Sequence, residues 1–249
     1  MIATILNHRS IRKYKQQEID RKIMDQILEA GIRASNTGNM QAYSIVITTE
    51  TALKEKLWEM HFKQNMVIQA PVILTFCADF NRFTQWCVQR KANPGFDNFL
   101  SFFNAAIDAL LVSQNVALAA EENNLGICYL GTTTYNADKI IEILKLPKGV
   151  VPVTTLVVGY PDENPGLTDR LPLESLIHRE TYQDYSPESI HEYYKEKEDS
   201  DLTKELLKIN NKETLAQIFT DNRYKKQDNI LFSRAFLEVI EKQGFMNQE

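Results

Sequence analysis

The stretch VPVTTLVVGYP, residues 151–161, is almost continuously apolar or β-branched and is closed by Gly159 and Pro161. Runs of this composition are typical of strands that are covered on both faces. A second such run, PVILTFC, occupies residues 71–77, and a shorter β-branched segment, YSIVIT, occupies residues 43–48. These three segments predict a sheet at the centre of the fold.

Segments with helical spacing lie between the predicted strands. We expect helices at residues 19–34, 52–61 and 137–144. Residues 105–122 are rich in alanine and carry apolar residues on more than one face, which predicts a central helix. Gly126 opens a further strand, ICYL. Helices that alternate with core strands predict an α+β or α/β layered fold.

The composition is that of a chain that folds around a core. Of the 249 residues, 43% are hydrophobic and 24% are charged, which excludes disordered and low-complexity classes. The formal net charge is −5, so there is no basic excess to neutralise phosphates, and no nucleic-acid partner is expected. Cys77, Cys87 and Cys128 form no CxxC pair, and their odd number indicates reduced thiols and a cytoplasmic location.

Neither membrane insertion nor export is expected from the sequence. The longest lipid-compatible run, residues 70–78, is far shorter than the ~20 residues that a spanning helix needs. The N-terminal sequence MIATILNHRSIRKYK places its basic cluster after a short apolar stretch, which is the reverse of a secretory signal.

The C-terminal part of the chain is more polar than the rest. Residues 192–205, EYYKEKEDSDLTKE, are mostly charged and are typical of a solvated helix or loop. Residues 230–242, ILFSRAFLEVIEK, regain helical periodicity and are expected to pack on the body of the fold. No internal repeat is visible, and no linker is long enough to require a second domain.

Common catalytic and binding motifs are absent from the sequence. It contains no GxGxxG after a strand, no GxxxxGK[ST], no GxSxG and no HExxH. The histidines, His8, His61, His178 and His191, do not fall at metal-ligand spacing with one another or with the cysteines. We therefore expect no metal site.

Four short segments have a composition that suits ligand binding. His8, Arg9, Ser10 and Arg12 place three cations and a hydroxyl group within five residues, which suits a phosphate, although composition alone favours a solvated basic segment. The polar run at residues 35–39 has the composition of a flexible loop with a helix cap. The remaining segments are Tyr129 to Thr132, at the end of a predicted buried strand, and Arg170, for which a surface salt bridge is the simplest explanation.

The order of these segments along the chain is more informative than any one of them. HRSIRKY, SNTGNMQAYS, FCADFNR, GICYLG, VVGYP and RLP follow one another with an order and spacing that resemble the nitroreductase family. The resemblance runs from about Leu6 to Tyr182, with a weaker similarity at FSRAFLEVIEKQGF, and is greatest to the NAD(P)H-dependent, FMN-containing flavin and nitro-compound reductases.

The resemblance implies an α+β fold with a central, mainly antiparallel sheet flanked by helices. It implies an entwined homodimer in which a long central helix, here residues 105–122, forms the interface and two FMN molecules lie between the chains. On this basis we expect residues 1–182 to form the FMN-binding core. Residues 183–249 would form a C-terminal helical extension that packs on the core or on the partner subunit.

The resemblance also implies a set of FMN contacts. His8, Arg9 and Ser10 match residues near the phosphate and ribityl end, and Arg12 matches a cation on the pyrimidine side of the flavin. Gln64 matches a residue at the isoalloxazine edge, and Arg170 matches a phosphate ligand. The segment contributed by the second subunit corresponds to Ser35, Asn36, Thr37, Met40 and Gln41. The strand end along the ring, where a backbone N–H reaches N5, corresponds to Tyr129, Leu130, Gly131 and Thr132.

The implied reaction is a ping-pong, two-electron transfer from NAD(P)H through flavin N5 to nitroaromatics, quinones or free flavin. The flavin would carry the chemistry, so no catalytic side chain is expected. Two alternatives remain open. One is a member of the same fold family that is specialised for another reduction, for dehalogenation or for flavin breakdown. The other is a flavin-binding or redox-sensing protein with slow turnover.

Some positions depart from the family pattern. Thr168 replaces a frequent lysine and Asp169 adds a negative charge, so we expect weaker binding of the FMN phosphate. Gly131-Thr132 replaces a frequent Gly-Gly, which would strain Thr132 if that position has a positive φ. Residues 191–229 do not match the usual lid, and the preference for NADH or NADPH stays open. The cations of this segment, Arg223, Lys225 and Lys226, would suit a coenzyme phosphate, although their composition favours a solvated patch.

Overall fold

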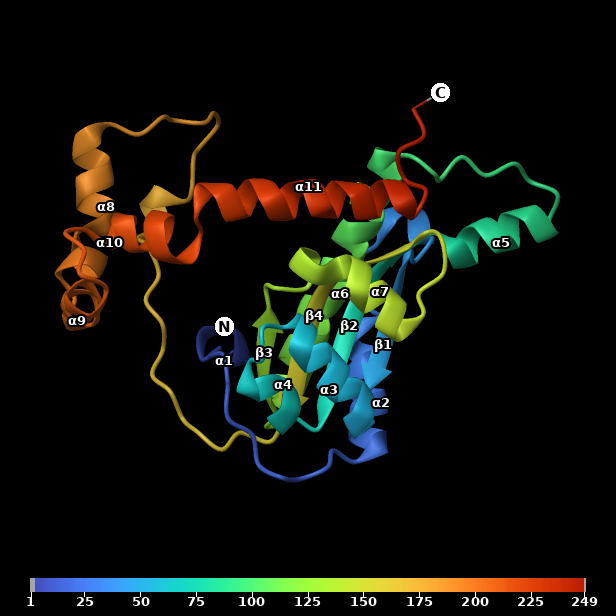
Figure 1. Cartoon of the computed structure of the whole chain (residues 1–249), viewed down its shortest axis with the longest axis horizontal. Helices are drawn as coiled ribbons and strands as arrows, with labels where there is room; N and C mark the ends of the chain where they lie inside the picture. Colours follow the sequence, from blue (N-terminus) through green and yellow to red (C-terminus); the bar gives the residue numbers. More distant parts are fainter. Residues whose placement is uncertain (1–2, 249) are drawn as a thin grey trace. The chain divides into compact units, whose positions relative to one another are not determined.

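An antiparallel sheet forms the centre of the protein in the computed structural model, which describes residues 3–248 (Figure 1). Its strand order is β1-β2-β4-β3, and each neighbouring pair runs antiparallel. The strands are β1 (Tyr43–Thr48), β2 (Val72–Asp79), β3 (Gly126–Leu130) and β4 (Val150–Gly159). All eight residues of β2 are buried, as its nearly continuous apolar run predicts for a strand covered on both faces.

Helices cover both faces of the sheet, and neighbouring strand residues point into different cores. Leu74 and Leu156 pack with α2 (Arg21–Gly31) and α6 (Phe99–Glu122). Ile73 and Val157 instead pack in a cluster on the opposite face. The helices on that face, which lie over the strands in Figure 1, are α3 (Thr51–Met60), α4 (Asn65–Gln69) and α7 (Ala137–Leu144).

The central helix α6 is longer than the sequence analysis predicted. It begins at Phe99 rather than at residue 105, because Asn98 caps it by accepting a hydrogen bond from the Ser101 N–H at 3.0 Å. By length and composition α6 is able to cross a membrane, with a mean hydropathy of 1.3, so residues 70–78 are not the longest lipid-compatible segment. Its buried side chains, however, pack against α2 and the sheet, as expected for the central helix of a folded core.

The close approach of α2 and α6 depends on a glycine. A Cβ atom at Gly31 would lie 2.2 Å from Cγ2 of Val116, far inside van der Waals contact. Because the helices would have to separate, we expect Gly31→Ala to lower the free energy of unfolding by about 1–3 kcal/mol. Urea denaturation monitored by circular dichroism at a fixed protein concentration measures this change.

Two further variants test the cause of that destabilisation. Gly95→Ala is the matched control, because a Cβ atom at Gly95 would meet nothing within 4 Å and stability should barely change. Combining Gly31→Ala with Val116→Ala removes the clashing methyl group, so the double variant should be more stable than the sum of the single effects predicts. An unchanged stability of Gly31→Ala would contradict the close helix packing.

The remaining elements complete two compact units. One unit contains the residues up to Gly166 and those from Phe232 onward, and the other is Leu167–Leu231. The first unit includes α1 (Ala3–Leu6), α5 (Asn81–Gln89) and short 3₁₀ turns at Thr37–Asn39 and Thr134–Asn136. The expected functional division after residue 182 stays a prediction, whereas the compact units divide after Gly166.

The C-terminal helix contributes to the core of the first unit. The helix predicted at 230–242 is α11 (Lys226–Lys242), and Val239 and Ile240 near its end are buried. They pack in one cluster with Phe102 and with Phe245, which follows the helix. This confirms the expectation that the periodic C-terminal segment packs on the body of the fold.

The second unit is helical. It contains α8 (Pro187–Asp199), α9 (Asp201–Asn210), α10 (Leu215–Gln217) and a π-helical turn at Ile218–Arg223. Ser200 separates the first two of these helices, and its hydroxyl group caps α9 by accepting from the Thr203 N–H at 3.1 Å. The charged run at residues 192–205 therefore forms exposed helices, which is one of the two structures that its composition predicts.

All three cysteines are free and buried. Cys77 in β2 and Cys128 in β3 are core residues, and burial raises the pKa of both thiols. Cys87 lies on the buried side of α5. A buried, protonated thiol is a weak nucleophile, so Cys77 and Cys128 are structural residues.

Candidate functional site

Two isolated backbone bridges, at Ser10 and at Tyr14, attach the segment of residues 8–15 to β3 and to the chain just after β4. Ser10 pairs in parallel with Ile127, and the Ile11 N–H donates to the Ile127 carbonyl at 2.8 Å. Gly126 permits this contact, since a Cβ atom there would lie 2.6 Å from Cγ1 of Ile11. Backbone pairing therefore fixes the segment that carries the predicted phosphate-binding residues.

The end of α6 holds the beginning of this segment. His8 Nδ1 lies 2.7 Å from Glu121 Oε1, and the Glu121 side chain is only 12% exposed. One turn earlier in the chain, the Thr4 hydroxyl donates to the carboxylate of Glu122. Two neighbouring carboxylates at the end of α6 thus anchor the N-terminal segment, and one of them orients the His8 imidazole.

The two arginines of the segment have different surroundings. The Arg9 guanidinium donates to Asn164 Oδ1 at 2.8 Å and to the Pro165 carbonyl at 3.1 Å. The Arg12 backbone N–H donates to Glu163 Oε1 at 2.5 Å. Within residues 3–248 the Arg12 guanidinium itself makes no hydrogen bond or ion pair. An exposed, unpaired cation therefore follows the residues that contact the beginning of β3.

A buried histidine contacts the chain just after β3. His61 is fully buried, and its Nδ1 lies 2.8 Å from Thr132 Oγ1. Burial lowers the pKa of His61 to about 4, so the ring is neutral at pH 7. Neither Gly131 nor Thr132 has a positive φ, and the expected strain at Thr132 is therefore absent.

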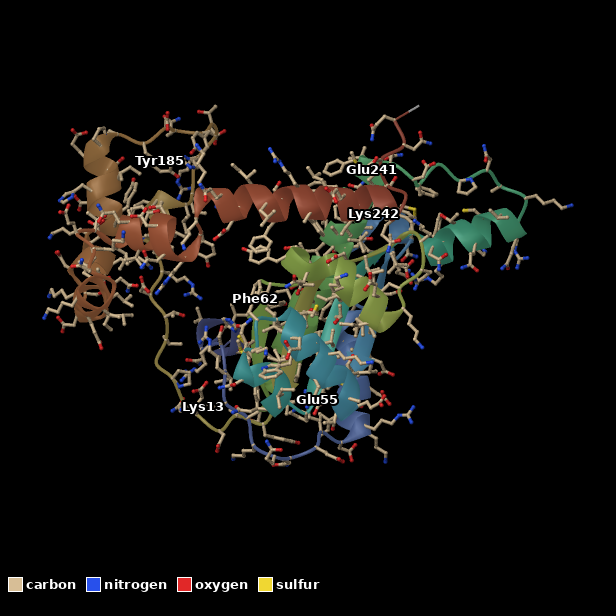
Figure 2. The ribbon with its side chains drawn as sticks, viewed as in Figure 1. Lys13, Glu55, Phe62, Tyr185, Glu241 and Lys242 are labelled. Atoms are coloured by element: carbon tan, nitrogen blue, oxygen red, sulfur yellow. The ribbon has the colours of Figure 1, made fainter. Side chains whose placement is uncertain are left out.

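His61 also supports the turn that carries Gln64. The Gln64 side chain donates to the His61 carbonyl at 3.0 Å. Phe62 and Lys63 between them have φ values of 54° and 56°, an uncommon backbone conformation for such residues. This backbone turn leaves Phe62, labelled in Figure 2, 54% exposed while His61 is buried. We call residues 8–12, Gln64 and residues 129–132 the first site segment.

A second group of predicted residues lies beside the middle of α6. The Thr37 N–H and hydroxyl group both donate to Asp108 Oδ1, at 2.8 Å and 3.0 Å. Asp108 is 1% exposed, and its other oxygen, Oδ2, has no partner within residues 3–248. Ser35, two residues before Thr37, is exposed. Asp108 thus fixes the loop that follows α2.

The rest of this loop lines an open cavity. The Gln41 N–H donates to Asn36 Oδ1 at 3.1 Å, and the Arg82 guanidinium donates to the Gln41 carbonyl. Asn36, Gln41 and Arg82 help to line a cavity of about 470 Å³. Met40 is half-buried and packs on the core. We call residues 35–41 the second site segment.

Within one chain, His8 and the second site segment contact different parts of α6. Glu121 contacts the first segment and Asp108 contacts the second, and these residues are thirteen positions apart on the continuous helix α6. At 1.5 Å per residue, this separation is about 20 Å along the helix axis. Tyr129, in the same first segment, donates instead to Ser113 Oγ, only five positions from Asp108, so this separation holds for His8 and not for the end of β3.

Arg170 belongs to the second compact unit. Its guanidinium donates to the Thr168 and Asp169 carbonyls at 3.2 Å and 2.9 Å. Asp169 pairs with Lys197 at 2.5 Å, and this hydrogen bond lowers the pKa of the Asp169 carboxyl group. The negative charge that the sequence analysis counted against phosphate binding is therefore already paired with a lysine.

Comparison with known proteins identifies the family of the chain. Residues 5–160 match the sequence profile of the nitroreductase family. The chain belongs to the nitroreductase family. The FMN reductase [NAD(P)H] of Bacillus subtilis (strain 168) is 32% identical over 251 residues, which cover 98% of this chain and 97% of that protein. The FMN reductase (NADPH) of the same organism is 35% identical over 183 residues, covering 73% and 74%.

A solved structure has the same fold over nearly the whole length of this nitroreductase. A crystal structure from Bacteroides fragilis NCTC 9343 superposes with a TM-score of 0.97 at 51% identity, covering 98% of this chain and 99% of the other. The predicted α+β fold, with an antiparallel sheet flanked by helices, is therefore confirmed. The assignments of individual residues to FMN contacts stay predictions.

Sequence reasoning missed three residues that hold the site of this nitroreductase in place. Asp108 interrupts an otherwise apolar stretch of a central helix, and this pattern is a usable signal for a buried polar contact. Glu121 lies at the polar end of the same helix, where a carboxylate is common and does not indicate a contact with the site. His61 sits next to an exposed Phe62, so hydrophobicity indicates the opposite burial for the two residues.

Proposed function

We propose that this chain is an FMN-dependent oxidoreductase that passes hydride from NAD(P)H, through flavin N5, to nitroaromatics, quinones or free flavin by a ping-pong, two-electron mechanism. The observation that carries the proposal is the grouping of His8, Ser10 and Arg12 beside the beginning of β3, in a chain related over nearly its full length to an FMN reductase. The two named relatives are FMN reductases that use NADPH or NAD(P)H.

The donors of the first site segment fit FMN. A phosphate requires cations and N–H or O–H donors, which His8, Arg9 and Ser10 supply within three residues. The Arg12 guanidinium, free of protein partners within residues 3–248, is available to a ligand. A fixed guanidinium near the pyrimidine side stabilises the negative charge that a reduced flavin carries around N1 and O2.

Two buried acceptors also fit a ligand with hydroxyl groups. Asp108 Oδ2 and Glu121 Oε2 are buried and have no partner within residues 3–248. A buried carboxylate oxygen without a donor is costly, by about 1–3 kcal/mol or more. The hydroxyl groups of a ribityl chain, or donors from a second subunit, would satisfy these oxygens.

The roles of the side chains are to bind and to orient. Bound FMN supplies the hydride chemistry at N5, so no protein group has to act as general acid or base. Backbone N–H groups of residues 129–131 would contact the ring edge, and His61 holds that strand end through Thr132. Gln64, Leu130, Gly131 and Arg170 keep the roles that the resemblance implies, as part of this proposal.

The proposal includes a homodimer, in which the family resemblance assigns the second site segment to the partner subunit. One face of α6 is apolar and exposed in a single chain. Its residues recur every three or four positions and are Leu100, Phe103, Ile107, Leu110 and Leu111. We call this set the α6 apolar face. Burial of this face against its symmetry mate would form an isologous interface and would let one chain complete the site of the other.

The first test is the visible spectrum of the purified full-length protein. We expect a yellow protein that releases FMN, rather than FAD, on denaturation, at about one FMN per chain. Absorbance spectroscopy and chromatography of the released flavin measure both quantities. Protein that is colourless and stays colourless after incubation with FMN would overturn the proposed function.

A stopped-flow experiment separates the enzyme from a flavin-binding or redox-sensing protein with slow turnover. Mixing the FMN-loaded protein anaerobically with NADPH, and separately with NADH, should bleach the flavin absorbance within seconds for at least one coenzyme. A binding protein would show no fast bleaching.

We also propose a cytoplasmic location, which the free thiols of all three cysteines support.

A further inference from the structure

Phe62 and Lys63 have an unusual backbone conformation in the turn between α3 and α4. Their φ values of 54° and 56° lie in the left-handed region, which is sterically unfavourable for residues other than glycine. The turn leaves Phe62 54% exposed, so packing in the core does not account for it. Backbone strain that the core does not explain is typical of positions that contact a ligand.

Two other aromatic rings lie next to Phe62. Tyr135, in the 3₁₀ turn after β3, and Phe232 on α11 stack on each other, with ring centroids 4.2 Å apart and planes 8° apart. The Phe62 ring lies 6.4 Å from each of them and is tilted by 49° and 57°, so neither ring stacks on its face. All three residues belong to the first compact unit. We call them the aromatic cluster.

Hydrogen bonds join the two loops that carry Phe62 and Tyr135. His61 Nδ1 lies 2.8 Å from Thr132 Oγ1, and the Asn136 side chain donates to the Met60 carbonyl at 2.6 Å. These contacts link the chain after α3 to the chain after β3. The aromatic cluster therefore has a fixed position next to the end of β3.

The same loops carry residues that the family resemblance assigns to the isoalloxazine ring. Gln64 lies two residues after Phe62, and residues 129–132 come shortly before Tyr135. A molecule that exchanges electrons with a flavin ring at these residues is therefore close to the aromatic cluster. Lys63, the cation beside Phe62, is paired with Glu59 at 3.2 Å, so the cluster offers an apolar contact rather than a free charge.

We propose that Phe62 determines specificity for the electron acceptor by stacking on it, and that the acceptor it favours is a flat, electron-poor aromatic ring such as that of a nitroaromatic compound. This inference rests on the proposed function, because it places the acceptor beside the flavin. The faces of aromatic side chains are negatively polarised, and nitro groups withdraw electrons from the ring that carries them. Offset stacking of the two rings is therefore favourable.

The experiment compares two electron acceptors after the flavin has been reduced. FMN-loaded full-length protein is reduced anaerobically with dithionite and mixed in a stopped-flow instrument with dinitrobenzene or with ferricyanide, which accepts electrons but has no aromatic ring. The second-order rate constant for reoxidation of the flavin is measured with each acceptor. Phe62→Leu keeps an apolar side chain without an aromatic face, so it should lower the dinitrobenzene-to-ferricyanide ratio of rate constants about 3- to 10-fold.

A glycine variant separates the ring contact from a structural role. Phe62→Gly removes the ring but suits the left-handed backbone, so its ratio should fall at least as far as that of Phe62→Leu while its melting temperature does not fall. Trp86→Leu is the matched control, because Trp86 is 52% exposed, lies 5.3 Å from the ring of Phe83, and belongs to α5, which carries no residue of the first site segment. Its ratio should equal that of the unchanged protein.

The outcomes distinguish this inference from the proposed function. An unchanged ratio in both Phe62 variants would overturn the role of Phe62 and leave the flavoenzyme intact. Loss of bound FMN, or an equal loss of rate with both acceptors, would assign the ring to flavin binding and would also overturn it. Dissociation of the Phe62→Leu protein in sedimentation velocity would assign the ring to a subunit contact, with the same consequence. Failure of the unchanged protein to bind FMN would instead overturn the proposed function, and this inference with it.

Discussion

Replacing Leu110 with arginine is expected to convert the protein from a dimer to a monomer and to weaken FMN binding by at least about 100-fold, which corresponds to about 2.7 kcal/mol. Leu110 lies on the α6 apolar face and is 48% exposed in a single chain. An arginine there would bury an unpaired charge in the proposed interface, which costs several kcal/mol. Without the partner, the first site segment loses the contacts of the second.

Sedimentation velocity and FMN titration at the same protein concentration measure the two effects. Leu202→Arg is the matched control, since Leu202 on α9 is 66% exposed and the charge change is identical. Circular dichroism establishes that both variants are folded. A monomeric Leu110→Arg protein that keeps the original FMN affinity would contradict the shared site, and so would an unchanged protein that is itself a monomer.

The strands were predictable because a strand that is buried on both faces has a nearly continuous run of apolar or β-branched residues. β1 has the bounds that the β-branched segment predicts, and β2 and β4 lie within two residues of their apolar runs. The start of α6 was not predicted, because residues 99–104 are rich in phenylalanine and carry little helical periodicity. The Asn98 cap that opens the helix is the signal that reasoning from periodicity overlooked.

The chemistry of the candidate site was predictable in part, whereas its supports were not. The cations at residues 8–12 are adjacent in sequence, so their combined charge is visible without a fold. Their orientation depends on Glu121, which is 113 residues away and is brought to His8 by the packing of α6. Local composition thus indicates which ligand is suitable, and long-range packing decides which atoms face it.

The division into units shows the same limit. The family resemblance ends at about Tyr182, and the functional boundary expected there stays a prediction. The compact units divide differently, because the chain leaves the first unit after Gly166 and returns to it at Phe232, where α11 supplies buried residues to the core. Local sequence does not indicate that the chain returns to the first unit. Only the helical periodicity of residues 230–242 indicates that this segment packs on the core.

His61 makes the protein sensitive to acid. In an unfolded chain the pKa of a histidine is about 6.5, whereas burial lowers the pKa of folded His61 to about 4. Between these values the unfolded chain binds a proton that the folded protein does not. The contribution of neutral His61 is therefore complete above about pH 6.5 and is lost progressively as the pH falls to about 4, by about 3 kcal/mol in total.

The buried surroundings of His61 explain the direction. Its Nε2 has no partner within residues 3–248, so protonation would place a charge and an unsatisfied N–H in the core. Urea denaturation at pH 7 and at pH 4.5 measures the loss of stability. His61→Asn keeps a polar side chain next to Thr132 but does not titrate, so its stability should fall by about 2–3 kcal/mol less over this interval.

A surface histidine provides the control for the acid prediction. His191 is exposed on α8, and His191→Asn should leave the difference between pH 7 and pH 4.5 as it is in the unchanged protein. His61→Asn also leaves a cavity, so its stability at pH 7 falls, and only the pH-dependent part of the change tests the argument. If His61→Asn and the unchanged protein lose stability in parallel, His61 is not the group whose protonation drives acid unfolding, and carboxylates with lowered pKa values, such as Asp169, must account for it.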